Sequence, residues 1–328
     1  MSWEIDQTIG GRVTVRDVLI DAERRLVAAG VPSPNFDAAQ IIAFTLGVAR
    51  NRLILQDVVT PEQRVRVEQF LTKRISRVPL QHLLGVAAFR HIELQVGPGV
   101  FIPRPETELV VEAGIRELRE LPAADRVAVD LCAGSGAIAF SLGVEVEDAM
   151  VFAVEVDPDA VRWTRLNLLA QEPALIAVRS RVDVVHDDAA SVADAGHSLA
   201  RLAGQVSVIV SNPPYIPVHM IPREPEVRDY EPKMALVAGA DGLDVVRGVL
   251  RTAAILRKPG GRVVVEHADV QGADAGLKGV AGLTESLVID EELGLITNCP
   301  TGKPVWGEVV DRSDLNGLPR FTIARRAS

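Results

Sequence analysis

Short apolar runs alternate with helical patterns over most of this chain, and this alternation limits its fold more than any other feature. The apolar runs predict strands at 127–131, 151–156, 182–185, 206–210 and 262–266. Helical periodicity predicts helices at 105–119, 136–143, 158–170 and 243–257. Strands that alternate with helices form a parallel sheet covered on both faces. The sequence therefore predicts an α/β fold, with tail strands near 309–310 and 321–324 that close the sheet in antiparallel orientation.

The first 80 or so residues have a different pattern and read as helices. Val15, Val18, Ala22 and Leu26 recur at helical spacing, and Ser33-Pro34 can open a second helix. Thr60-Pro61-Glu62-Gln63 combines an N-cap, a proline at the first helical position and a glutamine three residues after the cap. We expect an all-helical domain over 1–78, a β-hairpin linker over 79–100, and the α/β domain over 101–328. The stretch 272–283, rich in Gly and Ala, is expected to be a loop or a poorly packed helix.

Composition narrows the class of protein. Apolar residues make up 48% and charged residues 24% of the 328 positions, as in soluble globular proteins. The net charge of −9 argues against a broad nucleic-acid-binding surface. Cys132 and Cys299 lack metal-ligand spacing, and none of the six histidines forms a helical metal pair. Without a leader-like N-terminus or a long apolar span, we expect a cytoplasmic protein that does not bind a membrane. We also expect a monomer and no bound metal.

A glycine-containing loop follows the first strand of the predicted sheet. It reads Cys132-Ala133-Gly134-Ser135-Gly136 and comes directly after Asp130-Leu131. Glycines at a strand-to-helix turn let the backbone approach a ligand closely. The dinucleotide fingerprint G-x-G-x-x-G is absent, which weakens a dehydrogenase reading. The loop therefore predicts a nucleotide-type ligand of another class.

Acidic residues close the next two strands. A carboxylate at a second strand end can accept both hydroxyls of a ribose, and Glu155 is preferred for this. Asp157-Pro158 looks instead like an N-cap followed by the first helical residue. After the third strand, Asp188 is preferred over Asp187 as an acceptor for an adenine amino group. Acids at strand ends can also be solvated, so the prediction depends on their occurring in order.

The fourth strand ends in Asn212-Pro213-Pro214-Tyr215. The Asn212 side-chain oxygen and a carbonyl of the proline-fixed backbone can each accept one N–H from a planar nitrogen. The Tyr215 ring can pack against the plane of that group. The alternative is a rigid strand-to-loop turn without chemistry, which Asn and Pro also make.

Taken together, these features resemble the class I methyltransferase fold, which binds S-adenosylmethionine. A closer resemblance comes from the segments 79–85, 100–108, 231–236, 241–244 and 320–326, which are similar to those of the PrmC/HemK glutamine methyltransferases. It implies a Rossmann-like, mostly parallel sheet with an antiparallel C-terminal strand, and methylation of the Gly-Gly-Gln glutamine of bacterial peptide chain release factors. The implied catalytic residues are Asn212, Pro213, Pro214 and Tyr215. The implied cofactor-binding residues are Phe101, Arg104, Asp130, Cys132, Ala133, Gly134, Ser135, Gly136, Glu155, Val156, Asp188, Ala189 and Asn212.

Some alternatives stay open from the sequence. Phe101 could be an ordinary core aromatic, and Arg104 and Glu106 could brace a domain junction or a loop over the site. Cys132 stands where the family has a glycine, and 283–304 has no recognisable counterpart. An N6-adenine methyltransferase, a ribosomal-protein glutamine methyltransferase or a non-catalytic cofactor-binding scaffold are the competing functions. The helical domain is expected to dock the protein substrate.

Overall fold

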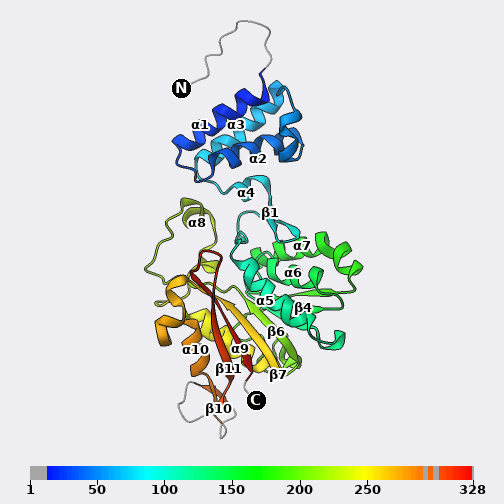
Figure 1. Ribbon diagram of the computed structural model, residues 1–328, viewed down its shortest axis with the longest axis vertical. Coiled ribbons are helices and arrows are strands. Elements are labelled where there is room, and N and C mark those ends of the chain that lie inside the picture. The colour runs from blue at the N-terminus through cyan, green and yellow to red at the C-terminus, as the bar shows by residue number, and fades with distance from the viewer. Residues whose placement is uncertain (1–12, 291–294, 298–302, 327–328) are drawn as a thin grey trace. The chain divides into compact units, whose positions relative to one another are not determined.

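The computed structural model describes residues 13–290, 295–297 and 303–326, and the chain divides into two compact units (Figure 1). The first unit takes the chain up to Gly85 together with Arg223–Tyr230, and the second contains Val86–Pro222 and Glu231–Ser328. The helical unit therefore extends past residue 78 and includes a segment far away in the sequence. Cys299 lies outside the described residues.

The first unit is built from short helices, as the sequence predicts. They are α1 (Val15–Ala28), α2 (Pro34–Leu46), η1 (Arg50–Leu55), α3 (Pro61–Ile75), α4 (Leu80–Leu84) and α8 (Pro225–Tyr230). The capping box at Thr60 is confirmed, because its hydroxyl accepts from Gln63 N–H while the Gln63 side chain accepts from Thr60 N–H. Leu26, Ile41 and Leu71 are almost fully buried in the core of this unit.

A buried ion-pair network explains why residues 223–230 belong to the helical unit. Arg74 is 4% exposed and donates to Asp37 at 2.7 Å and to Glu226 at 2.8 Å. Arg77 donates to both carboxylate oxygens of Glu226, at 2.6 and 2.7 Å. Burial raises the pKa of Asp37, and the Arg74 guanidinium opposes that rise. A buried charge left without a partner is costly, so the network holds α8 to this unit.

The second unit opens with a two-stranded hairpin, β1 (Val86–Phe89) and β2 (Ile92–Gln95). Its main sheet has seven strands in the order β11-β12-β7-β6-β3-β4-β5. Their bounds are β3 Val127–Leu131, β4 Met150–Glu155, β5 Arg181–His186, β6 Val206–Ser211, β7 Arg257–Glu266, β11 Trp306–Ser313 and β12 Pro319–Arg326. The pairs among β3 to β7 are parallel. β12 pairs antiparallel with both β7 and β11, so β12 runs against the parallel strands and β11 runs in their direction. This confirms the predicted class I methyltransferase sheet.

Helices cover both faces of the sheet. They are α5 (Thr107–Arg119), α6 (Ala137–Glu145), α7 (Pro158–Ala177), α9 (Asp244–Leu256) and α10 (Val280–Ser286), with 3-10 turns η2 (Ala123–Asp125), η3 (Ala200–Leu202), η4 (Lys233–Ala235), η5 (Asp269–Gln271) and η6 (Ala273–Lys278). One apolar cluster joins the sheet to α5, α6 and α7, and a second joins it to α9 and α10. Val208 and Val210 belong to the first cluster, whereas Ile209 between them belongs to the second. Successive side chains on a strand thus pack against the helices on opposite faces of the sheet.

Two sequence expectations for this unit need correction. The stretch 272–283 is not a loop or a poorly packed helix, because it contains η6 and the start of α10, where Val280 is fully buried. Helix α7 does not end near 170 but continues through Pro173 to Ala177. A small sheet of β8 (Val288–Asp290), β9 (Leu295–Thr297) and β10 (Lys303–Pro304) was also not anticipated.

Candidate active site

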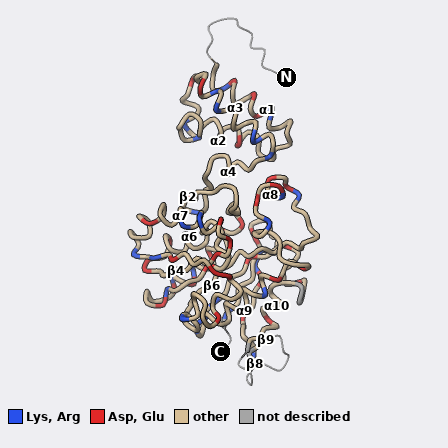
Figure 2. Tube along the Cα trace, turned by 180° about the vertical axis from the view of Figure 1, so that it is seen from behind, with Lys and Arg blue, Asp and Glu red and all other residues tan. Residues whose placement is uncertain are grey.

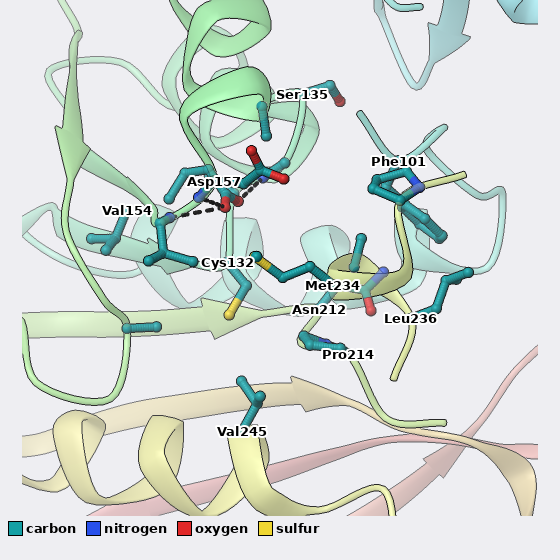
Figure 3. Close-up of a pocket in the computed structure, with 18 of the residues that line it drawn as sticks. Phe101, Cys132, Ser135, Val154, Asp157, Asn212, Pro214, Met234, Leu236 and Val245 are labelled. Atoms are coloured by element: carbon teal, nitrogen blue, oxygen red, sulfur yellow. Dashed lines mark hydrogen bonds between the residues drawn. The ribbon is translucent and has the colours of Figure 1, made fainter. Parts of the chain in front are cut away.

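A cavity of about 280 Å³ lies at the carboxyl ends of the parallel strands of the second unit (Figure 3). Among the residues predicted from the sequence, those that line it are Phe101, Cys132, Ala133, Gly134, Ser135, Glu155, Val156, Asp188, Ala189, Asn212, Pro214 and Tyr215. Arg104, Asp130, Gly136 and Pro213 adjoin this set in the sequence without lining the cavity. Parallel strands end at one edge of a sheet, and this brings residues 132–215 together.

Backbone contacts hold the loop from Cys132 to Gly136 in a fixed shape. Ala133 N–H donates to Val154 C=O at 2.9 Å. From α7, the Thr164 hydroxyl donates to Gly134 C=O at 2.6 Å, and the Asn167 amide donates to Ser135 C=O at 2.9 Å. Both of these α7 side chains are fully buried. The loop is therefore pre-formed, as a site for a bound ligand requires.

Cys132 adopts a left-handed backbone conformation, with φ of +69°. This explains why a glycine suits the position, since a Cβ in this region costs about 1–2 kcal/mol. Burial raises the pKa of the Cys132 thiol, so the side chain is neutral at physiological pH. The cysteine side chain therefore lines the cavity without adding a charge to it.

The left-handed backbone at Cys132 affects the free energy of unfolding of variants at this position. Cys132→Gly is expected to be more stable to unfolding than Cys132→Ala by about 1 kcal/mol, because glycine removes the left-handed strain that alanine keeps. Chemical denaturation of both variants measures the difference. At a position with an ordinary backbone, alanine would instead be favoured by about 0.5–1 kcal/mol, and that order would contradict the assignment.

The Glu155 carboxylate hydrogen-bonds the loop from Cys132 to Gly136 and also lines the cavity. It accepts from the N–H groups of Gly134, Val156 and Asp157 at 2.8 to 2.9 Å, as the dashed lines of Figure 3 mark. A carboxylate has about four lone-pair positions, so about one remains for a ligand hydroxyl. Burial raises the pKa of Glu155, and the three N–H groups oppose that rise. Asp157 caps α7 as expected, and it also lines the cavity.

Asp130 lies one layer behind the loop and is fully buried. One of its oxygens accepts from Ala139 N–H of α6 at 3.0 Å, and the other has no hydrogen-bond partner. Burial raises the pKa of Asp130 to about 8, helped by the nearby Glu155 charge and opposed by Ala139 N–H. Its contact with α6 orients the helix that follows the loop.

The two acids after β5 have separate surroundings. Asp187 binds the His197 ring and the Ser198 hydroxyl. Burial favours a higher pKa for Asp187, yet hydrogen bonds from Ser198 and His197 lower that pKa to about 2. Asp188 caps its own turn by accepting from Ala190 N–H at 2.8 Å, and it lines the cavity. Of the two acids, Asp188 is therefore the one that lines the cavity.

The turn that begins at Asn212 forms the other wall of the cavity. The Asn212 amide group donates to the Thr107 hydroxyl at 3.1 Å, which leaves its oxygen for other donors. The Tyr215 hydroxyl lies 3.4 Å from Glu266 Oε1, and the Gln271 side chain donates to Tyr215 C=O at 3.0 Å. Burial raises the pKa of Tyr215, so its hydroxyl stays protonated.

Residues beyond the predicted set complete the lining. They include Pro103, Thr107, Ile138, Val245, Pro232, Met234 and Leu236. The segment 231–236 was singled out in the sequence for its family likeness only, and Thr107 had no predicted role. Arg104 pairs with the buried Glu231 at 2.6 Å, and its guanidinium lies 4.7 Å from the centre of the Phe101 ring. Arg104 therefore braces the segment that supplies Met234, and Phe101 faces the cavity.

Comparisons with known proteins agree with this geometry. Residues 17–85 match the PrmC N-terminal domain, and residues 112–221 match the Methyltransferase small domain. The release factor glutamine methyltransferase of Streptomyces coelicolor is 43% identical over 307 residues, which cover 93% of this chain and 96% of that protein. The chain belongs to the release factor glutamine methyltransferase family. Enzymes of this name from Bifidobacterium longum and Mycolicibacterium smegmatis are 40% and 39% identical, over 79% and 95% of this chain and 88% and 98% of those proteins.

Membership of the release factor glutamine methyltransferase family confirms the predicted activity class and cofactor: the protein is an S-adenosylmethionine-dependent methyltransferase. The residues of the site fit this cofactor. The cavity is close to the lower end of the range for small-molecule sites, about 300 Å³, and its lining is mostly apolar. A Cβ on Gly134 would meet nothing within 4 Å, so the loop leaves open space beside it.

The described part of the chain lacks two further features. None of its helices is both long and apolar enough to cross a membrane. Within the same residues, no cluster of His, Cys, Asp or Glu has the arrangement of a metal site.

Proposed function

We propose that this protein methylates the side-chain amide nitrogen of the glutamine in the Gly-Gly-Gln motif of bacterial peptide chain release factors. The observation that carries the proposal is the orientation of Asn212 in the cavity wall. Its NH₂ group is engaged by Thr107, so its oxygen is the atom available to an incoming donor. A substrate amide has two N–H donors, and an acceptor at this position suits one of them.

The residues of the turn would act by positioning. An amide nitrogen is a poor nucleophile because its lone pair is delocalised into the carbonyl, and no carboxylate is basic enough to deprotonate it at neutral pH. Asn212 Oδ1 and the Pro213 carbonyl would accept the two N–H groups and aim the nitrogen at the methyl donor. The Pro213 ring and the following Pro214 restrict the backbone that carries this carbonyl, and the Tyr215 ring packs against the amide plane. Bound S-adenosylmethionine supplies an electrophilic methyl group on a sulfonium.

The cofactor would be held by the opposite wall. The loop from Cys132 to Gly136 and Phe101 would contact its methionine part, with Asp130 orienting the loop from behind. Glu155 and Val156 would bind the ribose, and Asp188 and Ala189 the adenine. Because Glu155 already accepts three N–H groups, we expect one direct ribose hydrogen bond rather than two, unless the loop yields.

The helical unit would supply substrate recognition. The match of residues 17–85 to the PrmC N-terminal domain and the names of the curated relatives support a release factor as the partner. Acidic and basic residues are interspersed along the trace of the chain (Figure 2), and the net charge is −9, so an extended nucleic-acid substrate is not favoured. A monomeric state and a cytoplasmic location stay predictions from the sequence.

Incubation with S-adenosylmethionine and a purified, unmethylated release factor tests this function. Peptide mass mapping should find one added methyl group, on the glutamine of the Gly-Gly-Gln peptide. A release factor whose motif glutamine is replaced by alanine is the matched control and should stay unmodified. Methyl transfer to nucleic acid or to a ribosomal protein, with the release factor unmodified, would instead select one of the competing functions.

A further inference from the structure

A buried polar network lies directly behind Asn212, and its hydroxyl and carboxylate groups take no direct part in the proposed methyl transfer. Its members are Thr107 at the start of α5, Glu266 at the end of β7, and Tyr215. Thr107 is 3% exposed and Glu266 is 1% exposed. The Thr107 hydroxyl accepts from Asn212 Nδ2 at 3.1 Å, and Tyr215 approaches Glu266 Oε1 at 3.4 Å. The Thr107 hydroxyl also lowers the pKa of the Glu266 carboxylate, which places these two buried groups next to one another.

The function of such a network follows from the symmetry of an asparagine side chain. Its oxygen and its NH₂ group have almost the same shape, so a half-turn about the last side-chain bond exchanges them at little steric cost. In the wrong orientation Asn212 would present donors to a substrate amide that itself has only donors on nitrogen. A partner that accepts from Nδ2 selects the useful orientation.

Thr107 can select it only if its own proton is committed elsewhere. A hydroxyl both donates and accepts, and a free Thr107 hydroxyl could turn and donate to the Asn212 oxygen. An ionised carboxylate has acceptors only, so Glu266 draws the Thr107 proton towards itself. The Thr107 lone pairs then face Asn212 Nδ2. Glu266 sets the direction of the whole chain of hydrogen bonds.

We propose that Thr107 and Glu266 are positioning residues that fix the orientation of the Asn212 amide for methyl transfer. The inference rests on the proposed function, since it concerns the same acceptor atom. Neither residue needs to touch the substrate, because Glu266 acts through Thr107 and Thr107 acts through Asn212.

The charges around Glu266 give the inference a pH dependence. Burial raises the pKa of Glu266 to about 7, the Thr107 and Tyr215 hydroxyls and the Arg320 guanidinium oppose the rise, and Glu106 adds to it. Arg320 on β12 is in turn paired with Asp314, and the neighbouring His267 lies 3.2 Å from Asp311. Protonated Glu266 gains an O–H donor of its own, so it no longer forces the Thr107 hydroxyl to donate. The ionised form is the active one, so activity should rise with pH through the pKa of Glu266.

Thr107→Val tests the proposal, with Thr107→Ser and Thr284→Val as its controls. The valine keeps the shape and removes the hydroxyl, so kcat should fall about 10-fold to 100-fold while KM and cofactor affinity change less than about threefold. Thr107→Ser restores the hydroxyl and should recover most of kcat. Thr284→Val removes another buried hydroxyl of the same unit, in α10, and should leave kcat unchanged.

The pH dependence of kcat/KM distinguishes a lost orientation of the Asn212 amide from general structural damage by the substitution. In the wild-type enzyme kcat/KM should rise about tenfold between pH 6 and pH 8, as expected for one ionisation near pH 7. Thr107→Val and Glu266→Gln should both flatten this rise. A Thr107→Val enzyme with wild-type kcat, or with the wild-type rise retained, would overturn the inference. A wild-type enzyme that leaves the release factor unmodified would refute the proposed function instead.

Discussion

Asn212→Ala is expected to lower kcat for release factor methylation by about 10²–10³-fold, the loss usual for removing one preorganised group that stabilises a transition state. The reason is that the Asn212 oxygen is the acceptor left free by the Thr107 contact. Affinity for S-adenosylmethionine should change less than about fivefold, because the Glu155 and Cys132–Gly136 wall is untouched. Single-turnover methylation and calorimetric cofactor binding measure the two quantities separately.

Tyr215→Phe is the comparison for this result. It keeps the ring that lines the cavity and removes only the hydroxyl that lies 3.4 Å from Glu266. Its kcat should fall less than about tenfold, because a long hydrogen bond behind the site contributes less than the acceptor itself. Near-normal turnover in Asn212→Ala, with cofactor binding intact, would remove Asn212 from its proposed role.

The parallel strands could be predicted from the sequence because burial on both faces leaves a continuous apolar run. The predicted strand 127–131 agrees with β3 to the residue. β7 was expected to begin at 262, because Pro259, Gly260 and Gly261 are unfavourable in strands. In the structure it begins at Arg257, since pairing with β6 outweighs the low strand propensity of these residues. Helix α7 passes Pro173 because packing, with Leu175 buried beyond the proline, outweighs one lost backbone bond.

Residues of the site could be predicted from the sequence only where the order of the parallel strands brings them close together. Glu155, Asp188 and Asn212 follow successive strands, so parallel pairing alone brings them to one edge. Thr107 and Met234 reach the same cavity through loops whose paths have no periodicity to read. The contact between Arg74 and Glu226 spans 152 positions, and nothing local in either segment indicates it.

Gly136→Ala is expected to destabilise the protein by about 2–5 kcal/mol, from left-handed strain of about 1–2 kcal/mol and over-packing of about 1–3 kcal/mol. Gly136 has φ of +85°, and a Cβ there would lie 2.2 Å from the Phe140 ring. Phe140 is fully buried in the core under α6, so the ring has no space into which to move. Denaturant unfolding of the cofactor-free protein measures the loss.

Gly134→Ala separates the two contributions. Gly134 also has a positive φ, of +57°, but a Cβ there meets nothing within 4 Å. Its loss should therefore be the strain alone, about 1–2 kcal/mol. Equal losses in the two variants would show that Phe140 yields and that the collision does not matter. A larger loss in Gly136→Ala would establish that the glycine is required for packing of α6 beneath the cofactor loop, while Gly134 is required only for the path of the loop itself.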